Sequence, residues 1–308
     1  MPHRRKYIPR TRDPHRHEQK EMAVVSLLNV PDEHPAVRDA WFVRRCTVTP
    51  ASAPGPLSDL LRLLGVQPSE TAGELDFLIP LWRVRSGATL LHEGAPAECV
   101  HVVRSGTFKS LKTSEDGYEQ VLGFAGPGEV LGFEALCRGQ QPMSAVALED
   151  STVYALPVRS LDGWRQGSPA LDHALQFALS RQLARVGEIT EMMAAVAAEV
   201  RLARFLVWLS AHMLECGQSP RRLRLRMSRR DIASLLGVAH ETVSRSFGSL
   251  VEWGYLRVDN REVEILDLDG LKAFKRSTRG FADQVSRRHG AGTAASPPAR
   301  HAPVGVAA

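Results

Sequence analysis

Apolar and polar residues recur most regularly between residues 227 and 251, where their spacing predicts two short helices joined by a glycine turn. Ser228 can accept a hydrogen bond from the backbone N–H of Asp231 and so begin the first helix. Gly237 supplies the positive φ that a tight turn requires. The apolar positions of the two helices are Ile232, Leu235 and Leu236, then Val243, Phe247, Leu250 and Val251. The pattern is typical of a helix-turn-helix.

The opposite face of the second helix is polar and carries His240, Glu241, Ser244 and Arg245. A carboxylate can accept from the cytosine amino group and an arginine can donate twice to guanine, so this face suits the major groove of DNA. For each residue alone, a solvated surface position is the simpler interpretation, but the complete spacing favours base reading. Residues 256–258 and 263–265 then alternate around a turn, which predicts the two strands of a winged helix.

Short alternating runs separated by glycines fill residues 81–157, for example at 100–103, 107–111 and 152–156, and predict a β-barrel or β-roll. A short amphipathic helix is predicted before it, at residues 57–65. Residues 201–215 predict the first helix of the C-terminal domain. Residues 221–226 predict a strand whose cationic face is either a solvated edge or a phosphate contact.

Between these two regions, leucines and other apolar residues recur every three or four positions from Pro169 to about Val200. This spacing predicts one long helix with an apolar seam. An intramolecular core helix is the alternative, but a helix-turn-helix gains affinity when a two-fold axis places two reading helices one DNA turn apart. We therefore expect a dimer seam. Its predicted residues are Leu175, Leu179, Leu183, Val186, Ile189 and Met193.

Composition narrows the class of protein. The 308 residues suffice for two domains with apolar cores, and a formal charge of +5 is compatible with a polyanionic partner. Four scattered cysteines and the lack of a signal peptide or a long apolar segment predict a cytoplasmic protein that does not enter a membrane. We find no phosphate loop, nucleophile elbow or metal-ligand spacing, so the sequence predicts no enzyme.

Residues 76–272 resemble the Crp/Fnr family of bacterial transcription regulators. The resemblance is carried by Glu241-Thr-Val-Ser-Arg245, which matches the E-T-[IV]-S-R core of Fnr-type recognition helices. It implies that Glu241, Ser244 and Arg245 read a TTGAT half-site on double-stranded DNA, that the protein is a homodimer and that it contacts RNA polymerase. Ala239 departs from the usual Ser or Thr cap, and His240 stands where cyclic-AMP-type members carry Arg. The expected phosphate contacts are Ser228, Arg229, Arg230 and Thr242.

The same resemblance makes the roll a cyclic-nucleotide-binding-type domain, but its signal is not identified. Met143 stands where cyclic-nucleotide binders carry an arginine that pairs with the phosphate. A conventional iron–sulfur cluster needs four thiolates, whereas Cys46 is alone before the roll and Tyr154 stands at the position of the fourth ligand. Cyclic AMP and a 4Fe-4S cluster are therefore not expected. The candidate effector region comprises Gly132, Phe133, Glu134, Met143 and Ser144.

The sequence predicts an α+β fold and divides the chain into five segments. These are an N-terminal extension without regular structure at 1–56, a β-roll sensor with its leading helix at 57–168, a dimerisation helix at 169–200, a winged helix-turn-helix at 201–272 and an irregular tail at 273–308. We expect a signal at the roll to alter the seam and so the spacing of the reading helices. The alternative is a constitutive DNA-binding regulator whose roll is only a dimerisation scaffold.

Overall fold

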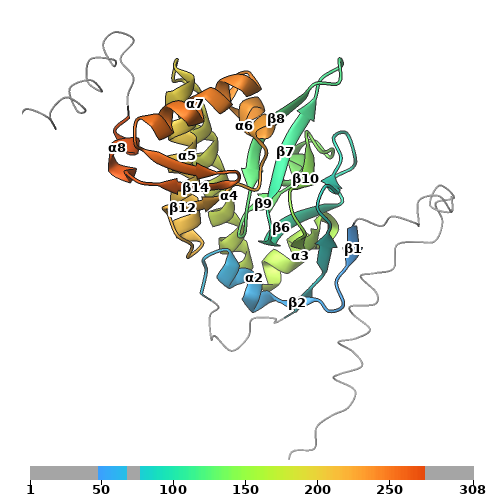
Figure 1. Cartoon of the computed structure of the whole chain (residues 1–308). Coiled ribbons are helices and arrows are strands. Elements are labelled where there is room, and N and C mark those ends of the chain that lie inside the picture. The colour runs from blue at the N-terminus through green and yellow to red at the C-terminus, as the bar shows by residue number, and fades with distance from the viewer. Residues whose placement is uncertain (1–47, 68–76, 275–308) are drawn as a thin grey trace, which may run out of the picture.

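The computed structural model describes residues 48–67 and 77–274, which form a β-roll, a long helix and a smaller helical domain with a three-stranded sheet (Figure 1). The family-type architecture predicted from the sequence, α+β with a C-terminal helix-turn-helix, is confirmed. The predictions for residues 1–47 and 275–308 lie outside the described residues.

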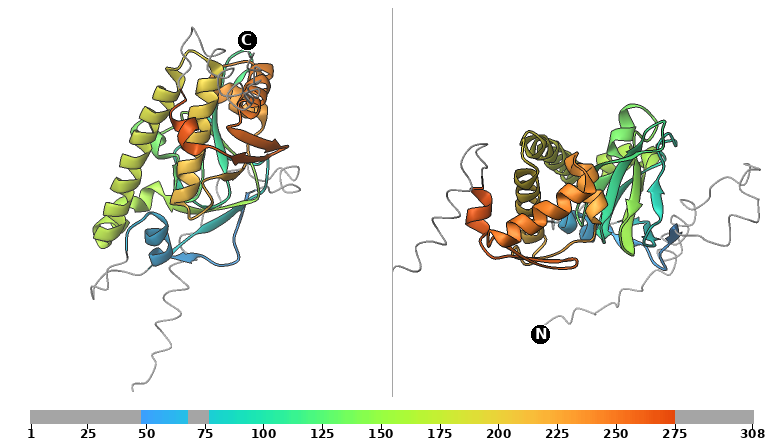
Figure 2. Two further views of the ribbon diagram at one scale, coloured as in Figure 1. Left: turned by 60° about the vertical axis from the view of Figure 1, so that its left-hand side comes forward. Right: turned by 45° about the horizontal axis from the view of Figure 1, so that its top comes forward.

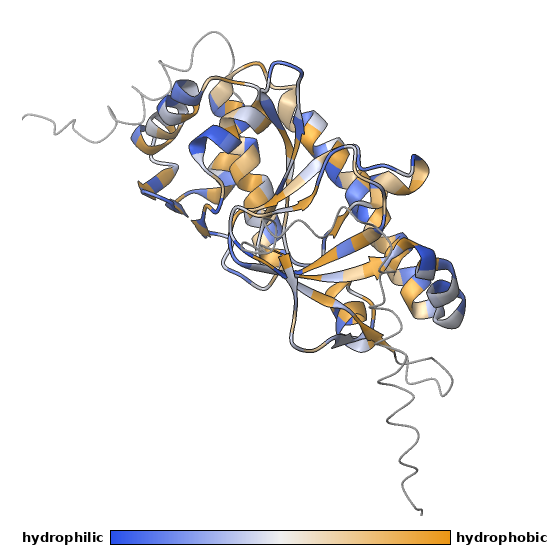
Figure 3. Ribbon diagram, turned by 90° about the vertical axis from the view of Figure 1, so that its right-hand side faces the viewer, coloured by the Kyte–Doolittle hydropathy of each residue, from blue (hydrophilic) through white to orange (hydrophobic). Residues whose placement is uncertain are grey.

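The β-roll consists of two antiparallel sheets, in the order β1-β4-β11-β6-β9 and β5-β10-β7-β8. Val103 and Val153 of the first sheet and Phe108 of the second are fully buried and belong to one apolar cluster between the sheets. The roll strands are β4 Leu81–Val84, β5 Thr89–Leu91, β6 Cys99–Ser105, β7 Phe108–Thr113, β8 Glu119–Ala125, β9 Val130–Leu131, β10 Ser144–Ala147 and β11 Ser151–Pro157. A 3₁₀-helix, η3, spans Phe133–Cys137. Hydrophobic residues follow the roll strands and alternate with polar residues on the helices (Figure 3).

The roll begins earlier in the chain than the sequence predicted. Strand β1 (Val48–Pro50) pairs with β4, and β2 (Gly55–Pro56) pairs with β3 (Leu78–Ile79). The prediction of an irregular segment up to residue 56 is therefore wrong for residues 48–56. Strands of two or three residues carry too few alternating positions to be seen in a sequence. The predicted helix that follows is confirmed as α2 (Leu57–Leu63).

The long helix is shorter than predicted. After α3 (Val158–Gly167), helix α4 spans Pro169–Met193, and its cap Ser168 accepts from the Leu171 N–H. The prediction of one helix to residue 200 is wrong, because α5 begins anew at Ala198. The turn between them has no glycine or proline to mark it. It is held by Arg201, whose Nε donates to the Ala195 carbonyl at 2.7 Å.

The residues predicted for the dimer seam lie on different faces of α4. Leu175 is buried with Leu171 and Ala178 in the apolar cluster of the roll and α2, so its assignment to the dimer seam is wrong. Met193 is half-buried, and its Cε lies 3.1 Å from where a Cβ on Gly237 would be, against the helix-turn-helix turn. The exposed fractions of Leu179, Leu183 and Val186 are 37%, 74% and 59%, which leaves these three as an outward apolar stripe, hereafter the α4 stripe.

The C-terminal domain folds back beside α4, and α5 (Ala198–Glu215) runs alongside it (Figure 2). Its sheet has the order β12-β14-β13, which confirms the two predicted wing strands and the basic strand. The remaining elements are β12 Arg222–Arg224, α6 Arg229–Leu236, α7 His240–Glu252, β13 Leu256–Asp259, β14 Glu262–Ile265 and α8 Leu268–Lys272. Phe205, Ile232 and Leu250 are fully buried in its core.

Candidate nucleic-acid interface

Local sequence builds the helix-turn-helix as expected. Ser228 caps α6 in a reciprocal capping box: its side chain accepts from the Asp231 N–H at 3.1 Å, and the Asp231 carboxylate accepts from the Ser228 N–H at 2.8 Å. Gly237 ends the helix with φ of 61°. Helix α7 begins after Ala239, whose side chain makes no cap hydrogen bond. The first turn of α7 therefore leaves its backbone N–H groups without a side-chain cap.

The four predicted base-reading residues lie together on the outward face of the first two turns of α7. His240, Glu241, Ser244 and Arg245 are all exposed, whereas Val243 is buried on the opposite side. The Ser244 hydroxyl donates to the His240 carbonyl at 3.3 Å, a local bond that a base edge can replace. Within the described ranges no ion pair joins Glu241 or Arg245 to another side chain. Both charges thus face solvent at a helix N-terminus.

The predicted phosphate contacts separate into two groups. Arg230 is exposed on α6, and Thr242 is half-buried in the first turn of α7. Arg229 instead lies over the Phe247 ring, 3.4 Å from its centroid, and its Nη2 donates to the Asn260 carbonyl. Burial lowers the pKa of Arg229 to about 10. The guanidinium thus joins α6 to α7 and the wing, and the Ser228 hydroxyl is likewise engaged, with the Asp231 carboxylate.

The basic strand has the buried and cationic faces that its alternation predicted. Leu223 and Leu225 are buried, while Arg222 and Arg224 are exposed. Acidic partners lie close by: Arg224 is 3.5 Å from Glu262 in the wing, and Arg226 is 3.1 Å from Glu149 in the roll. These two arginines are therefore partly neutralised within the protein.

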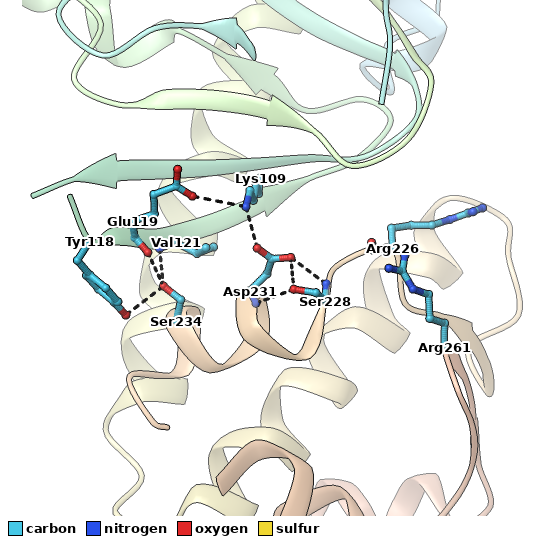
Figure 4. A network of polar contacts seen from close by, with 9 residues as sticks. All are labelled: Lys109, Tyr118, Glu119, Val121, Arg226, Ser228, Asp231, Ser234 and Arg261. Carbon is cyan, nitrogen blue, oxygen red and sulfur yellow. Dashed lines mark hydrogen bonds and ion pairs between the residues drawn. The ribbon is translucent and has the colours of Figure 1, made fainter. Parts of the chain in front are cut away.

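Helix α6 is docked against the edge strand of the roll (Figure 4). The Ser234 hydroxyl accepts from the Val121 N–H at 2.9 Å and donates to the Glu119 carbonyl at 3.1 Å. One serine thus satisfies two backbone groups on the open edge of β8, as a neighbouring strand would. Ser234 is buried, and the sequence analysis did not single it out. The feature of the sequence that could have pointed to Ser234 is its place as a polar residue between two apolar positions, 233 and 235.

An ion pair lies beside this serine. Lys109 Nζ of β7 is 2.8 Å from Asp231 Oδ1, and both side chains are mostly buried. Burial raises the pKa of Asp231, but the hydrogen bonds from Lys109 and Ser228 outweigh it and leave the pKa below its usual value. The carboxylate that caps α6 therefore also holds the helix to the roll.

A second contact joins the roll, α4 and α5. Arg185 of α4 forms an ion pair with Glu129 of the roll and donates through Nη2 to His212 Nδ1, at 3.0 Å. His212 Nε2 lies 3.4 Å from the same Glu129 carboxylate. Burial lowers the pKa of His212 to about 4, and the positive charge of Arg185 adds to the effect, while Glu215 opposes it. A Cβ on Gly126 would lie 2.9 Å from His212 Nε2, so this approach requires a glycine.

The candidate effector region surrounds a cavity of about 330 Å³ between the roll and α4. Gly132, Glu134 and Met143 line it. Phe133 packs against the cluster of the roll and α2, and the Ser144 hydroxyl accepts from the Glu93 N–H at 3.0 Å. The structure therefore brings together three of the five predicted residues and adds residues of α4 that the sequence analysis had not placed there, among them Arg185 and Ile189.

The cysteines do not form a cluster in the described part of the chain. There, no three His, Cys, Asp or Glu side chains are close enough to hold a metal ion, and Cys46 lies outside this part. Burial raises the pKa of Cys99, and the neighbouring Glu98 adds to this effect. Tyr154 is buried. In the same residues we find no helix whose length and apolarity would let it span a bilayer.

Two family models match the chain: a cyclic nucleotide-binding domain at residues 81–166 and a Crp-like helix-turn-helix domain at residues 200–274. The chain is 35% identical to the transcriptional regulatory protein Btr of Bordetella pertussis over 206 residues, 67% of this chain and 85% of the relative. It is also 35% identical to the fumarate and nitrate reduction regulatory protein of Salmonella typhimurium over 199 residues, 65% of this chain and 80% of the relative.

Among solved structures, FixK2 of Bradyrhizobium japonicum aligns with a TM-score of 0.57 and 26% identity, over 64% of this chain and 98% of FixK2. TTHB099, a transcriptional regulator of the CRP family from Thermus thermophilus, aligns with a TM-score of 0.51 and 25% identity, over 62% of this chain and 94% of its own. Both likenesses span the roll and the helix-turn-helix together.

Proposed function

The chain belongs to the Crp/Fnr family of DNA-binding transcription regulators, and from this premise we propose that it acts as a homodimer on a TTGAT-like palindromic site, switched through its β-roll. The family membership also means that the protein is not an enzyme. The observation that carries the proposal is the reading face of α7. Its carboxylate, hydroxyl and guanidinium lie exposed at the start of one helix, with a complete hydrophobic core behind them.

We assign the contacts with DNA according to which side chains are exposed and free of partners within the domain. Glu241, Ser244 and Arg245 read base edges, and His240 reads the outer position of the half-site. Arg230 and Thr242 contact phosphates beside them. Ser228 and Arg229 act mainly by holding α6 and α7 in place, because their side chains are already bonded within the domain.

The α4 stripe supports the dimer. Leu179, Leu183 and Val186 stand at helical spacing and are exposed, which is costly for a helix without a partner. In a parallel pair of α4 helices, the stripes of two protomers would cover each other. Ile189 lies at the margin of this stripe, half-buried against the core of the DNA-binding domain and lining the roll cavity. The two-fold axis would then set the distance between the reading helices.

Two contacts connect the roll to the helix-turn-helix domain. One is the docking of α6 on β8, through Ser234 and Lys109, and the other is the junction of Glu129, Arg185 and His212. A change in the roll or in α4 would therefore shift α6 and α5, and with them α7. The alternative of a constitutive regulator is favoured by Met143 at the phosphate position. It predicts that loosening both contacts leaves operator affinity unchanged.

A binding-site selection tests the proposal. Full-length protein is incubated with random double-stranded DNA, and the bound fraction is sequenced over several rounds. We expect a two-fold symmetric site with TTGAT-like halves about one helical turn apart. Enrichment of single half-sites would contradict the dimer, and symmetric sites of unrelated sequence would contradict the reading assigned to Glu241, Ser244 and Arg245. We also propose that the protein acts in the cytoplasm and contacts RNA polymerase when it is bound at such a site. Transcription in vitro from a promoter that carries the site measures this contact.

A further inference from the structure

A groove separate from the roll cavity lies between helices α4 and α5 and is bordered by α8 (Figure 2). Its volume is about 550 Å³, which is enough for one large side chain and its neighbours. The half-buried Val207 and Trp208 of α5 supply apolar surface, and Ala184 of α4 and Ala211 of α5 are exposed beside them. This apolar surface is open to contact by another segment of protein.

The groove faces away from the proposed dimer seam. At 3.6 residues per turn, the groove positions 184, 188 and 192 lie on nearly the opposite side of α4 from the α4 stripe. The roll covers a third side of the helix, at Gln182 and Ile189. In the dimer proposed above, the two stripes cover each other, so the second copy leaves the groove open.

Acidic side chains stand in the wall of the groove. Glu188 and Glu191 of α4 and Glu215 of α5 line it, and all three are exposed. Among the residues that the structure describes, Glu188 and Glu191 form no ion pair, and Glu215 contacts only His212, at 3.8 Å. The groove can therefore accept cations from another segment.

Most cations of the same wall are directed at acceptors elsewhere. Arg181 donates to the carbonyls of Leu64 and Gly128, Arg185 pairs with Glu129, and Arg204 donates to the Glu191 carbonyl. None of these three guanidinium groups forms an ion pair with a carboxylate of the groove, and the fourth cation, Lys272, is exposed.

The described part of the chain ends at this groove. Phe274, its last residue, is buried and lines the groove, and its ring centroid lies 5.7 Å from that of Trp253 and 5.4 Å from that of Tyr255. Because Phe274 is held in this way, the residues that follow it start beside the groove. They read Lys275-Arg-Ser-Thr-Arg-Gly-Phe281, with three cations and then an aromatic side chain.

Charge and reach both fit this segment to the groove. Residues 275–308 contain six Lys or Arg and one Asp, so their formal charge of +5 equals that of the whole chain. From Arg204 to Glu215, helix α5 advances about 16 Å, at 1.5 Å per residue. Seven residues in an extended conformation reach about 23 Å, at about 3.3 Å each, so residues 275–281 suffice to follow the groove.

We propose that residues 275–281 dock into this groove of their own subunit. Phe281 covers the apolar surface at Trp208, and the three cations of the segment lie beside Glu188 and Glu191. The docked segment ties α4 to α5 and α8, and so holds the DNA-binding domain to the long helix. The inference goes beyond the proposed function, because the docking requires neither a signal nor an operator.

Photocrosslinking in the full-length protein tests the placement. The photoreactive amino acid p-benzoylphenylalanine replaces Phe281, and mass spectrometry identifies the crosslinked peptides after irradiation without DNA. We expect crosslinks within one chain, to residues 181–192 and 204–215. The same label in place of Val306, 25 residues further along the chain, is the control and should not select these two segments. Crosslinks spread over other surfaces, a covalent dimer, or crosslinks that form only with added duplex DNA would overturn the inference.

Charge reversal tests the ion pairs. Glu188→Lys with Glu191→Lys should lower the yield of the Phe281-site crosslink by roughly fivefold, because like charges then face each other. Adding Arg276→Glu and Arg279→Glu to the same protein should restore the yield. Glu115→Lys with Asp162→Lys is the matched control, because these two exposed carboxylates lie outside the groove, and it should leave the yield unchanged. An unchanged yield in the groove variant, or no restoration by the second pair, would overturn the inference.

Discussion

The reading face of α7 and the cavity beneath α4 use polar side chains in opposite ways. On α7 the polar residues are exposed, come from two turns of one helix and lie on a complete apolar core. In the cavity, Gln141 and Gln182 come from separate elements and are surrounded by apolar walls. An exposed polar face is satisfied by water until DNA displaces it. The amide oxygens of Gln141 and Gln182 are buried and have no hydrogen-bond partner among the described residues, so the wall of the cavity carries a desolvation cost that the exposed face of α7 does not.

The largest expected effect comes from the proposed dimer seam at the α4 stripe. Leu183→Glu places a charge in the α4 stripe and should convert the dimer to monomers, lowering operator affinity by about 100- to 10,000-fold through loss of bivalency. Ala184→Glu is the control, because this exposed residue lies on the same helix but outside the stripe. Sedimentation and operator binding measure both effects. A Leu183→Glu protein that remains dimeric would show that the seam lies elsewhere.

The reading face itself is tested at Arg245. Arg245→Ala should cost about 1–3 kcal/mol per half-site on a TTGAT-like operator and much less on random DNA, because the variant cannot donate two hydrogen bonds to guanine. Competition binding with operator and scrambled duplexes measures the difference. An equal loss on both duplexes would assign Arg245 to phosphate contact.

The docking of α6 on the roll is tested at Ser234. Ser234→Ala removes the partner of the buried Val121 N–H and of the Glu119 carbonyl, and should weaken the contact by about 1–3 kcal/mol. The Val121 amide should then exchange with solvent roughly tenfold faster or more. Ser249→Ala, a half-buried serine of α7, is the control. Unchanged exchange at Val121 together with unchanged operator affinity would favour the roll as a mere scaffold.

The junction at His212 predicts a pH dependence. The pKa of His212 is held at about 4 in the folded protein, below the value near 6.5 of an unfolded chain, so the unfolded state binds a proton first as the pH falls. The contribution of this residue to stability is therefore complete above about pH 6.5 and is lost towards pH 4, by about 3 kcal/mol, since each pKa unit is worth about 1.4 kcal/mol. Denaturant unfolding should show a shallower decrease for His212→Gln. His101, whose pKa burial also lowers to about 4, supplies the decrease that remains. An identical slope in wild type and variant would refute the role of His212.

The smallest expected effect is on the salt dependence of DNA binding, and it distinguishes the roles of two neighbouring arginines. Arg230→Ala should weaken binding to all DNA sequences and reduce the slope of the salt dependence by roughly 1.8 for the proposed dimer, about 0.9 for the one phosphate lost in each half-site. Arg229→Ala should leave the slope nearly unchanged and instead lower the stability of the domain, because its guanidinium packs on Phe247. Operator titrations from 50 to 200 mM salt, about the range over which such slopes are resolved, compare the two. A reduced slope for Arg229→Ala alone would exchange their roles.

The sequence predicted the elements whose pattern is local. Helix α6, its cap Ser228, the turn at Gly237 and the outward face of α7 were all visible, because neighbours within one turn or one hydrogen bond determine them. The end of α4 was not visible. The turn after Met193 depends on Arg201 reaching the Ala195 carbonyl and on Met193 meeting Gly237, and no glycine or proline marks residues 194–197 themselves.

By itself, therefore, the sequence determined a β-roll, an apolar helix and a winged helix-turn-helix whose second helix has an exposed polar face, through patterns that repeat over a few positions. Only the tertiary structure decided which face of α4 stays open, and that Leu175 turns inward. It also placed Ser234 on the edge of β8, 113 residues from Val121, and left the Gln141 amide oxygen unpaired. Contacts between such distant residues follow from how whole elements pack, and no local spacing encodes them.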